Sequence, residues 1–304
     1  MSLCNCLSTV YDTIPFILLL ATIKYLYGYW KGNQKIESKK TRVVRFRPAV
    51  EGNKFQRRQA KSSEFIENAI KQHLSSAVMN PKIKLDPING VNKDFAFFIR
   101  NVLTRKECKE LIKASESTGF EQRKYSGKGD DSSSCCFQSN ILSNQVIFKR
   151  IEQFLPQKSY FDADSSLTMN DLTHYSSDNN QTIECYGDLK CLNTSCRVEK
   201  YRTKEHLKIH RDGCVLVSNT NDTFTVYAII IYLNDDYIGG NTRFCMDIDP
   251  NPKDGKYPYS FLDVKGKIGD ALVFRHEILH KGGAVDEGTK YILRLDAAYQ
   301  TIKS

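Results

Sequence analysis

The sequence predicts an α+β fold that is mostly β, with helices in its first half and an antiparallel β core in its second. Three observations predict it. A chain of 304 residues with 40% hydrophobic content is long enough to bury one sizeable core. Helical patterns occur before Pro156. After about Cys196 the chain consists of β-branched and aromatic runs that are separated by clusters of Gly, Asn, Asp and Pro.

An apolar run near the start predicts a membrane anchor. Most of residues 14–30 are apolar or aromatic, and Lys24 is the single charged residue among them. This length is at the short end of what spans a bilayer, and the Tyr and Trp residues gather at its end, as in an interfacial belt. We therefore expect residues 1–30 to be a transmembrane or signal-anchor segment. A cleaved signal peptide and a helix lying in the membrane interface are the alternatives.

A basic strip follows the anchor. Residues 31–61 hold eleven Lys or Arg and two Glu, so this segment accounts for the whole net charge of +9. A charge confined to one segment beside an apolar run favours anionic lipid headgroups as its partner, and it argues against a nucleic-acid-binding fold. A solvated linker is the alternative. The positive-inside rule places the rest of this single-pass protein in the cytosol.

Cysteines and sequons favour the opposite side of the membrane. The chain has ten cysteines and three N-glycosylation sequons, at Asn180, Asn193 and Asn221. Both features suit the lumen of the endoplasmic reticulum, where disulfides form. The sidedness therefore stays open. The cysteine spacing between 185 and 214 lacks the C-x2-C rhythm of structural zinc sites, so no second metal is expected there.

Helical patterns precede the β core. Residues 62–78 predict an amphipathic helix inside a basic linker, 31–90, and the folded domain is expected to span 91–304. A helix begins after Thr104, where Glu107 completes a capping box, and Gly119 ends it. A second helix is expected over 143–156.

The β core is expected to span about 196–300. Runs of β-branched and aromatic residues that are bounded by Gly, Asn, Asp and Pro predict each strand. The expected strands, with one earlier in the chain, are 94–103, 197–201, 223–234, 241–245, 270–275 and 290–299.

A zinc-protease string occurs near the end of the core. His276, Glu277 and His280 fit H-E-x-x-H, which binds zinc only when it lies on a helix, because one helical turn brings both histidines to the same ion. The preceding residues, 271–275, favour a strand instead, and Gly282 with Gly283 would end any helix within a turn. A zinc metalloprotease is therefore a minor alternative.

A different metal site fits the same region better. His210 and Asp212 project from one face of an extended chain, because side chains alternate with period two. His280 follows a strand and supplies a third ligand, which gives two histidines and a carboxylate with open positions opposite them. Lys290, ten residues on, is placed to pair with the distal carboxylate of a metal-bound dicarboxylate. Arg294 shares its strand face and is the alternative cation.

Several segments together resemble a known family. They are NVLTRKECKELI with the following GF, YRTKEHLKIHRDG, YLNDDYIGGNTRF, GDALVF and HKGGAVDEGTKYILRLD. In order and spacing they are similar to the prolyl 4-hydroxylase-like branch of the 2-oxoglutarate- and Fe(II)-dependent oxygenases, over about residues 91–300. The resemblance implies a double-stranded β-helix, or jelly-roll, core flanked by N-terminal helices.

The resemblance also implies roles for individual residues. The Fe(II) ligands implied are His210, Asp212 and His280, and the 2-oxoglutarate-binding residues implied are Lys290, Tyr201 and Thr242. The chain departs from the family near Asp296, where collagen-type members favour tryptophan, and this departure weakens the case for a collagen-type substrate.

The expected function is that of a membrane-anchored dioxygenase. It would hydroxylate a protein or peptide side chain, with proline foremost, while 2-oxoglutarate is decarboxylated to succinate and CO2. Fe(II), 2-oxoglutarate and L-ascorbate are the expected cofactors. The alternative from another class is a jelly-roll binding module that has lost its chemistry and is tethered to the membrane.

Overall fold

The computed structural model describes residues 64, 66–68, 71, 72, 74, 82–122, 132–161, 185–248 and 259–302. All of them belong to one compact unit, Phe46–Ser304. The expected anchor, 1–30, lies outside the described residues, as does most of the expected linker, 31–90. Within the described part of the chain, no helix combines the length and the apolar character needed to cross a membrane.

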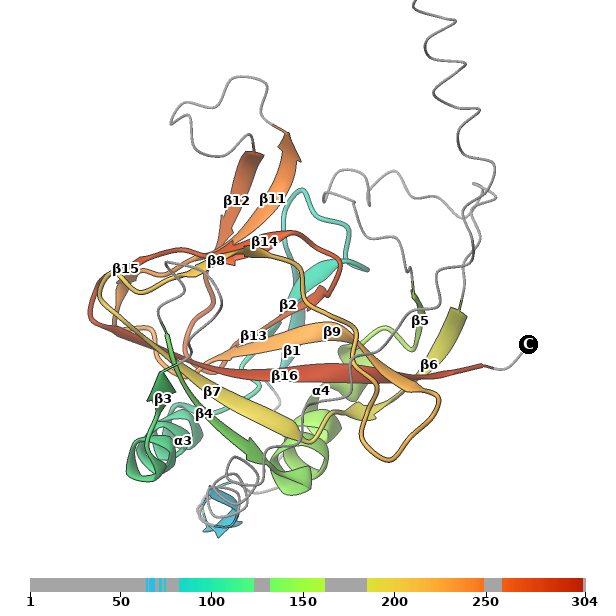
Figure 1. Cartoon of the computed structure of the whole chain (residues 1–304), viewed down its shortest axis with the longest axis horizontal. Coiled ribbons are helices and arrows are strands. Elements are labelled where there is room, and N and C mark those ends of the chain that lie inside the picture. Colours follow the sequence, from blue (N-terminus) through green and yellow to red (C-terminus); the bar gives the residue numbers. More distant parts are fainter. Residues whose placement is uncertain are drawn as a thin grey trace, which may run out of the picture. The chain divides into compact units, whose positions relative to one another are not determined.

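One large antiparallel sheet forms the body of the described fold (Figure 1). Its strands follow the order β1-β2-β13-β9-β16-β7-β4-β3, while β6 pairs with β16 and β5 with β6. The bounds are β1 Lys84–Pro87, β2 Ala96–Arg100, β3 Glu121–Gln122, β4 Ser133–Gln138, β5 Lys158–Phe161, β6 Cys185–Leu192, β7 Ser195–Arg202, β9 Thr223–Tyr232, β13 Ala271–Arg275 and β16 Thr289–Thr301.

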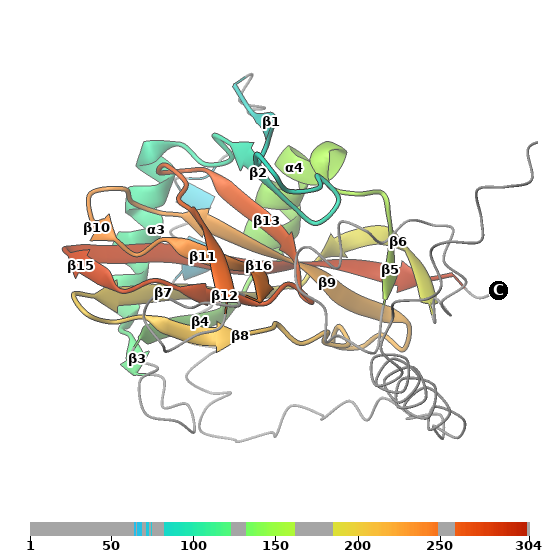
Figure 2. The ribbon, with the colours of Figure 1, turned by 90° about the horizontal axis from the view of Figure 1, so that it is seen from above.

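A smaller sheet faces the large one. Its order is β12-β11-β14-β8. Strands β10 and β15, which adjoin β11 and β14 in the sequence, pair with each other as a separate two-stranded sheet. Figure 2 shows β8, β11 and β12 lying over the large sheet. The bounds are β8 Leu207–His210, β10 Ile238–Gly239, β11 Thr242–Ile248, β12 Tyr259–Val264, β14 His280–Gly282 and β15 Val285–Glu287.

Alternation along β9 divides the buried residues into two cores. Ile229 and Ile231 point to one face of the large sheet and pack in a cluster with the helices. Ala228 and Ile230 point to the other face, where they join Phe244 of the small sheet. Side chains of neighbouring strand residues point to opposite faces, so a strand covered on both sides is apolar throughout. This explains the unbroken run TVYAIII.

Helix α3 (Arg105–Thr118) confirms the capping pattern in the sequence. The Glu107 backbone N–H donates to Thr104 Oγ1 at 3.2 Å, and the Thr104 N–H donates to Glu107 Oε2 at 2.7 Å. Each of these two hydrogen bonds therefore gives a partner to a backbone N–H that the start of the helix leaves without one. Gly119 ends the helix with φ of +96°, a conformation that favours glycine.

The second predicted helix is present, but it is not a regular α-helix. It runs as a π-helix, η1 (Ile141–Phe148), then α4 (Lys149–Ile151) and a 3-10 turn, η2 (Glu152–Phe154). Asn144 explains part of this irregularity, because its side chain both accepts from and donates to the backbone of Leu192 on β6, at 2.8 and 3.0 Å. Such a partner is distant in the sequence and invisible to local periodicity.

The strands expected from the sequence are all present, and five more precede the expected core. Each expected segment after 196 contains a strand, and 94–103 contains β2. The sequence missed β1, β3, β4, β5 and β6, which lie before 196. β4 has the sequence SSCCFQ, which lacks β-branched residues, and its pairing with β7 holds it extended. β1 pairs with β2 although it precedes the expected domain start near 91.

The first predicted helix, 62–78, is helical at its described residues except Leu74. Residues 64, 66–68, 71 and 72 are helical, and Ile66 is fully buried in the core on the helix side of the large sheet. Seven cysteines lie within the described side chains and all are free thiols, while Cys185 has no described side chain.

Candidate metal centre

Three side chains from separate parts of the small sheet converge on one point. His210 ends β8 and His280 begins β14, and the two residues are directly paired across these antiparallel strands. Asp212 follows two residues after His210, and its backbone N–H donates to the carbonyl of His276 at 3.0 Å. This hydrogen bond holds the chain after β8 against the turn before β14.

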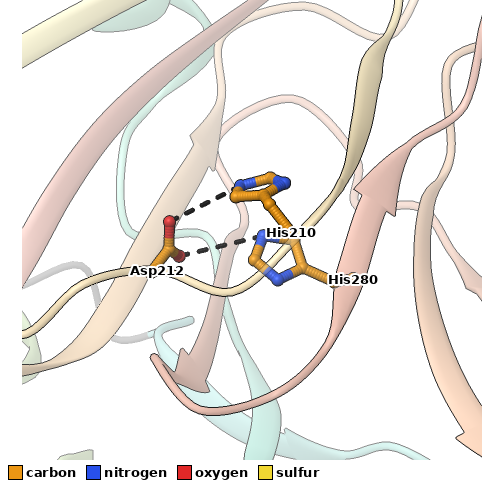
Figure 3. Close-up of side chains that lie close together, drawn as sticks. All are labelled: His210, Asp212 and His280. Carbon is orange, nitrogen blue, oxygen red and sulfur yellow. Dashed lines mark ion pairs between the residues drawn. The ribbon is translucent and has the colours of Figure 1, made fainter.

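The ligand-type atoms of the three residues face each other (Figure 3). Nε2 of His210 lies 3.6 Å from Oδ1 of Asp212, and Nε2 of His280 lies 3.8 Å from Oδ2 of the same carboxylate. The imidazole centroids are 4.3 Å apart. One ligand atom of each residue lies within 4.8 Å of the others. We name His210, Asp212 and His280 the facial triad.

Backbone carbonyls fix the histidine tautomers. Nδ1 of His210 contacts the carbonyl oxygen of Lys208 at 2.7 Å, and Nδ1 of His280 contacts that of Ile278 at 2.8 Å. A carbonyl only accepts, so each Nδ1 carries the proton and donates it. The lone pair of each neutral ring is therefore on Nε2, which faces Asp212. Hydrogen bonds of this kind orient histidines that bind metals.

The protonation states suit metal binding. Burial lowers the pKa of His280 to about 4, so its Nε2 is unprotonated at neutral pH. Burial also lowers the pKa of His210, but the Asp212 carboxylate outweighs this effect and leaves that pKa raised. Burial raises the pKa of Asp212, yet the positive charge of Arg294 outweighs it, and the pKa stays well below its ordinary value. Asp212 is a carboxylate at every physiological pH.

The donor set fits Fe(II). Oδ2 of Asp212 is buried and accepts no hydrogen bond within the described structure, although Arg294 lies 3.0 Å away as an ion pair. A buried carboxylate oxygen without a hydrogen bond is costly unless a cation takes it. Two imidazoles and one carboxylate on one face, with the opposite positions open, are typical of non-haem Fe(II) oxygenases.

The zinc-protease alternative is wrong. Residues 276–279 form a turn and a bend between β13 and β14, and no helix carries the H-E-x-x-H string. Nε2 of His276 contacts Oδ1 of Asp296 at 3.1 Å, away from the facial triad. Glu277 pairs with the Arg275 guanidinium at 2.7 Å. The two potential protease residues therefore have structural partners, and His280 alone belongs to the metal site.

A cavity of about 530 Å³ adjoins the facial triad. It lies between the two sheets, and strands β7, β8, β9, β11, β14 and β16 contribute to its lining. This volume falls in the range of pockets that bind small molecules. The lining includes all of the residues implied for 2-oxoglutarate, Lys290, Tyr201 and Thr242, together with the alternative Arg294.

Lys290 lies at one end of this cavity. Its ammonium donates to the carbonyl of Gly240 at 2.7 Å and lies 5.5 Å from the Tyr201 ring. Burial lowers the pKa of Lys290 to about 8, and the carboxylate of Glu199 opposes that effect. A cation in such a site is poised to pair with an anionic ligand, which would repay its desolvation.

Tyr201 and Thr242 lie near Lys290 and are both buried. Tyr201 is paired with Lys290 across β7 and β16, and its hydroxyl donates to Glu199. The Thr242 hydroxyl lies 3.3 Å from that of Tyr232. The structure thus brings the three residues implied for 2-oxoglutarate into one cavity, and their roles stay predictions.

Arg294, the alternative cation, pairs with two carboxylates of the chain. Its Nη2 lies 3.0 Å from Oδ2 of Asp212 and 2.8 Å from Oδ1 of Asp296. Its side chain is only 11% exposed, so these contacts are not a surface salt bridge. Two carboxylates of the chain itself hold the guanidinium, while the ammonium of Lys290 has only a carbonyl among the described hydrogen-bond acceptors.

Other side chains that line the cavity were not assigned a site role from the sequence. Arg197 and Glu199 line it from β7, and Ile230 and Ile292 line it from β9 and β16. The available signal was the period of two, since 197, 199 and 201 share one face of β7. His206, which lies close to His210 in the sequence, contacts only a backbone carbonyl, that of Lys204 at 3.2 Å, among its described contacts.

Comparison with known proteins gives structural likenesses alone. No protein-family model matches the sequence. No curated protein matches it either. The structure is similar to that of a viral collagen prolyl hydroxylase from Paramecium Bursaria Chlorella virus-1, in its 2-oxoglutarate complex. The two are 17% identical with a TM-score of 0.37, over 67% of this chain and 96% of that one.

Two further solved structures are similar. One is an oxidoreductase of the 2OG-Fe(II) oxygenase family from Burkholderia pseudomallei, with 10% identity and a TM-score of 0.40 over 67% of this chain and 84% of that one. The other is an alpha-ketoglutarate-dependent carbocyclase of nogalamycin biosynthesis, with 11% identity and a TM-score of 0.42 over 68% and 80%. Because these identities and TM-scores are low, the proposed function rests on the geometry of the site.

Proposed function

We propose that this chain is an Fe(II)- and 2-oxoglutarate-dependent oxygenase of the prolyl 4-hydroxylase-like branch, with a jelly-roll core formed by the two facing sheets. One observation carries the proposal. The two tautomer-fixed histidines and Asp212 converge at a cavity that also holds the buried ammonium of Lys290. A metal and a dicarboxylate therefore have separate places in one enclosed site.

Each lining residue has a task in this proposal. His210, Asp212 and His280 hold Fe(II), and Lys290 pairs with the distal carboxylate of 2-oxoglutarate. Tyr201 and Thr242 contact the same cosubstrate.

The two ends of 2-oxoglutarate would be held differently. The cosubstrate chelates the metal at its keto-acid end, so that a cation at the far end fixes its direction. Ile230 and Ile292 form an apolar wall that keeps water away from the reacting atoms.

Bound Fe(II) supplies the redox chemistry: a C–H bond, O2 and 2-oxoglutarate become an alcohol, succinate and CO2, with one oxygen atom in the alcohol and one in succinate. L-ascorbate is proposed as the reductant that keeps the iron ferrous. The chain contributes orientation and a fixed electrostatic environment. The substrate is proposed to be a protein or peptide side chain, with proline foremost.

The proposal includes a membrane anchor. The apolar run of 14–30 and the basic strip of 31–61 support attachment to a membrane with anionic headgroups, and no nucleic acid is expected as a partner. The charge of the strip favours a cytosolic catalytic domain, and the three sequons favour the lumen. Glycosylation of Asn193 or Asn221 in cells would decide for the lumen.

Succinate formation tests the proposed activity. The full-length chain is incubated with Fe(II), 2-oxoglutarate, ascorbate and a peptide mixture, and succinate and oxygenated peptides are measured by mass spectrometry. We expect succinate that requires Fe(II) and that falls to background in His210→Ala. His206→Ala is the matched control, because His206 lies outside the facial triad, and it should keep the activity. A chain that binds Fe(II) but forms no succinate would instead be the binding module.

A further inference from the structure

The floor of the cavity is an ordered array on two neighbouring strands. β7 and β16 pair antiparallel, and alternate residues of each face the cavity. The pairs across the two strands are Tyr201 with Lys290, Glu199 with Ile292, and Arg197 with Arg294. The floor therefore has two ends. We name them the lysine end, with Lys290, and the arginine end, with Arg197 and Arg294.

The metal site lies over the arginine end. Arg294 lies four positions after Lys290, which places their Cα atoms about 13 Å apart along an extended strand. Arg294 contacts Asp212 at 3.0 Å, so the facial triad stands over this part of the floor. A metal-bound 2-oxoglutarate with its far carboxylate at Lys290 extends away from Arg197. The arginine end is then left for the substrate.

Arg197 has an open hydrogen-bonding fork at this end. Its Nε lies 2.6 Å from the carboxylate of Glu199, but its two terminal amino groups make no hydrogen bond to any described residue. The Arg197 side chain is 30% exposed and lines the cavity, so its terminal amino groups are accessible to a ligand that enters there. Arg150 and Arg275, which are buried, place their terminal amino groups on Glu107 and Glu277 instead. A guanidinium fork matches the geometry of a carboxylate and binds it through two parallel hydrogen bonds.

The cavity also has an excess of positive charge. Its lining includes five basic side chains, Arg197, Lys208, Lys281, Lys290 and Arg294, but only two acidic ones, Glu199 and Asp212. Fe(II) and 2-oxoglutarate carry equal and opposite charges, so their binding leaves this excess in place. An anionic substrate is therefore attracted to the site, and a basic one is repelled.

We propose that the arginine end binds a carboxylate of an acidic peptide, next to the residue that is oxidised, with Arg197 as its direct partner. This inference rests on the proposed function and names its substrate class. Arg197 sets specificity by pairing with an Asp or Glu side chain. An uncharged amide of the same shape fills the same space but gives up the charge-assisted pair.

Two matched peptide libraries test the proposal. Both are degenerate around a central residue, and they differ only in that every Asp and Glu of one is Asn or Gln in the other. The full-length chain is assayed with each library, and oxygenated peptides are counted by mass spectrometry. Fluorescent samples of both libraries are also titrated against protein loaded with Mn(II) and 2-oxoglutarate under nitrogen, which measures binding without turnover.

We expect the acidic library to bind and react better than the amide library by on the order of tenfold or more. The ratio should fall close to one in Arg197→Gln and be partly kept in Arg197→Lys. Arg202→Gln is the control, because Arg202 lies on the same strand but outside the cavity lining, and it should keep the wild-type ratio.

Three outcomes would overturn the inference. Equal use of both libraries by the wild type would show that no carboxylate is read. An unchanged ratio in Arg197→Gln would assign the preference to another residue. Stimulation of succinate formation by small carboxylic acids but by neither library would make the substrate a small molecule. Failure of the proposed function itself is distinguishable, since no succinate would then form with any addition.

Discussion

Arg294 and Asp212 are joined by an ion pair of 3.0 Å between Nη2 and Oδ2, which links β16 to the facial triad. The same guanidinium holds Asp296 at 2.8 Å, and Asp296 in turn contacts His276 at 3.1 Å. The proposed metal ligand Asp212 is thereby oriented by a network that is anchored on β16 of the large sheet. Groups of this kind, one step behind the ligands, hold a metal site in its geometry.

Loss of Arg294 should destabilise the protein strongly. Arg294→Met leaves the carboxylates of Asp212 and Asp296, which are 12% and 22% exposed, without their shared guanidinium, and breaking a largely buried pair in this way costs about 3 kcal/mol. Urea denaturation of the metal-free protein measures the loss. Asp296→Asn in the same chain should recover part of it, and a double-mutant cycle gives the coupling.

Arg243→Met, which breaks the more exposed pair with Asp263, is the control and should cost about 1 kcal/mol or less. Equal losses at both sites would contradict the network.

Affinity for 2-oxoglutarate should fall above about pH 8. Burial lowers the pKa of Lys290 to about 8, so its ammonium is charged below this pH and loses its proton above it. Binding of a carboxylate favours the charged form. The Kd should therefore be nearly constant from pH 7 to 8, and then rise by about tenfold for each further pH unit. Calorimetric titration of Mn(II)-loaded protein measures it.

Two variants separate Lys290 from other groups that titrate in this range. Lys290→Arg keeps a charge at all accessible pH values and should abolish the break near pH 8. Glu199→Gln should move the break to lower pH, because the Glu199 carboxylate raises the pKa of Lys290 against the effect of burial. A break that stays at the same pH in Lys290→Arg would show that another group controls binding.

Gly240 is predicted to hold the position of the Lys290 ammonium. Gly240 has φ of +64°, and a Cβ there would lie 3.2 Å from Cδ of Lys290 and 3.1 Å from the Tyr237 ring. Gly240→Ala should therefore displace Lys290 and raise the Kd for 2-oxoglutarate on the order of tenfold. The Kd for Mn(II) should not change, because the facial triad is untouched. Gly213→Ala, whose Cβ would meet nothing within 4 Å, is the control. An equal loss of Mn(II) binding in Gly240→Ala would show general disruption instead.

The capping box of α3 should contribute measurably to stability. Thr104→Ala removes the oxygen that accepts from the Glu107 N–H, and Glu107 is buried, so this donor loses its partner. The expected loss is about 1 kcal/mol in the free energy of unfolding. Thermal or urea denaturation measures it, with Thr118→Ala at the other end of α3 as a smaller control. A loss in Thr104→Ala no larger than in Thr118→Ala would rule out a special role for the cap.

The parts of the fold that sequence predicted well are those with local signals. α3 has its cap at Thr104 and its stop at Gly119, and both features lie within the segment itself. β9 is an apolar run of β-branched and aromatic residues with turn residues on either side. β4 is different, because SSCCFQ gains its extended form from its partner β7, and the π-helical turns depend on contacts between Asn144 and a distant strand.

The residues of the site also differ in whether local sequence signals could point to them. His210, Asp212, His280 and Lys290 were singled out because their spacing along the chain reflects the strand period and resembles a family pattern. The structure brings all four to one cavity, and their roles remain predictions. The pair between Arg294 and Asp212 could not be found, since it joins β16 to the end of β8 across the interior of the fold. The sequence shows the two charges 82 positions apart, and only the fold shows that they meet.

The most direct test of the central claim is an anaerobic Fe(II) titration of the full-length chain, followed by admission of oxygen with 2-oxoglutarate, ascorbate and the peptide mixture present. We predict one Fe(II) bound for each chain and succinate formed after oxygen enters, with both lost in His280→Ala. Wild-type protein that binds the ion without forming succinate would contradict the account, and so would a His280→Ala protein that binds Fe(II) as tightly as the wild type.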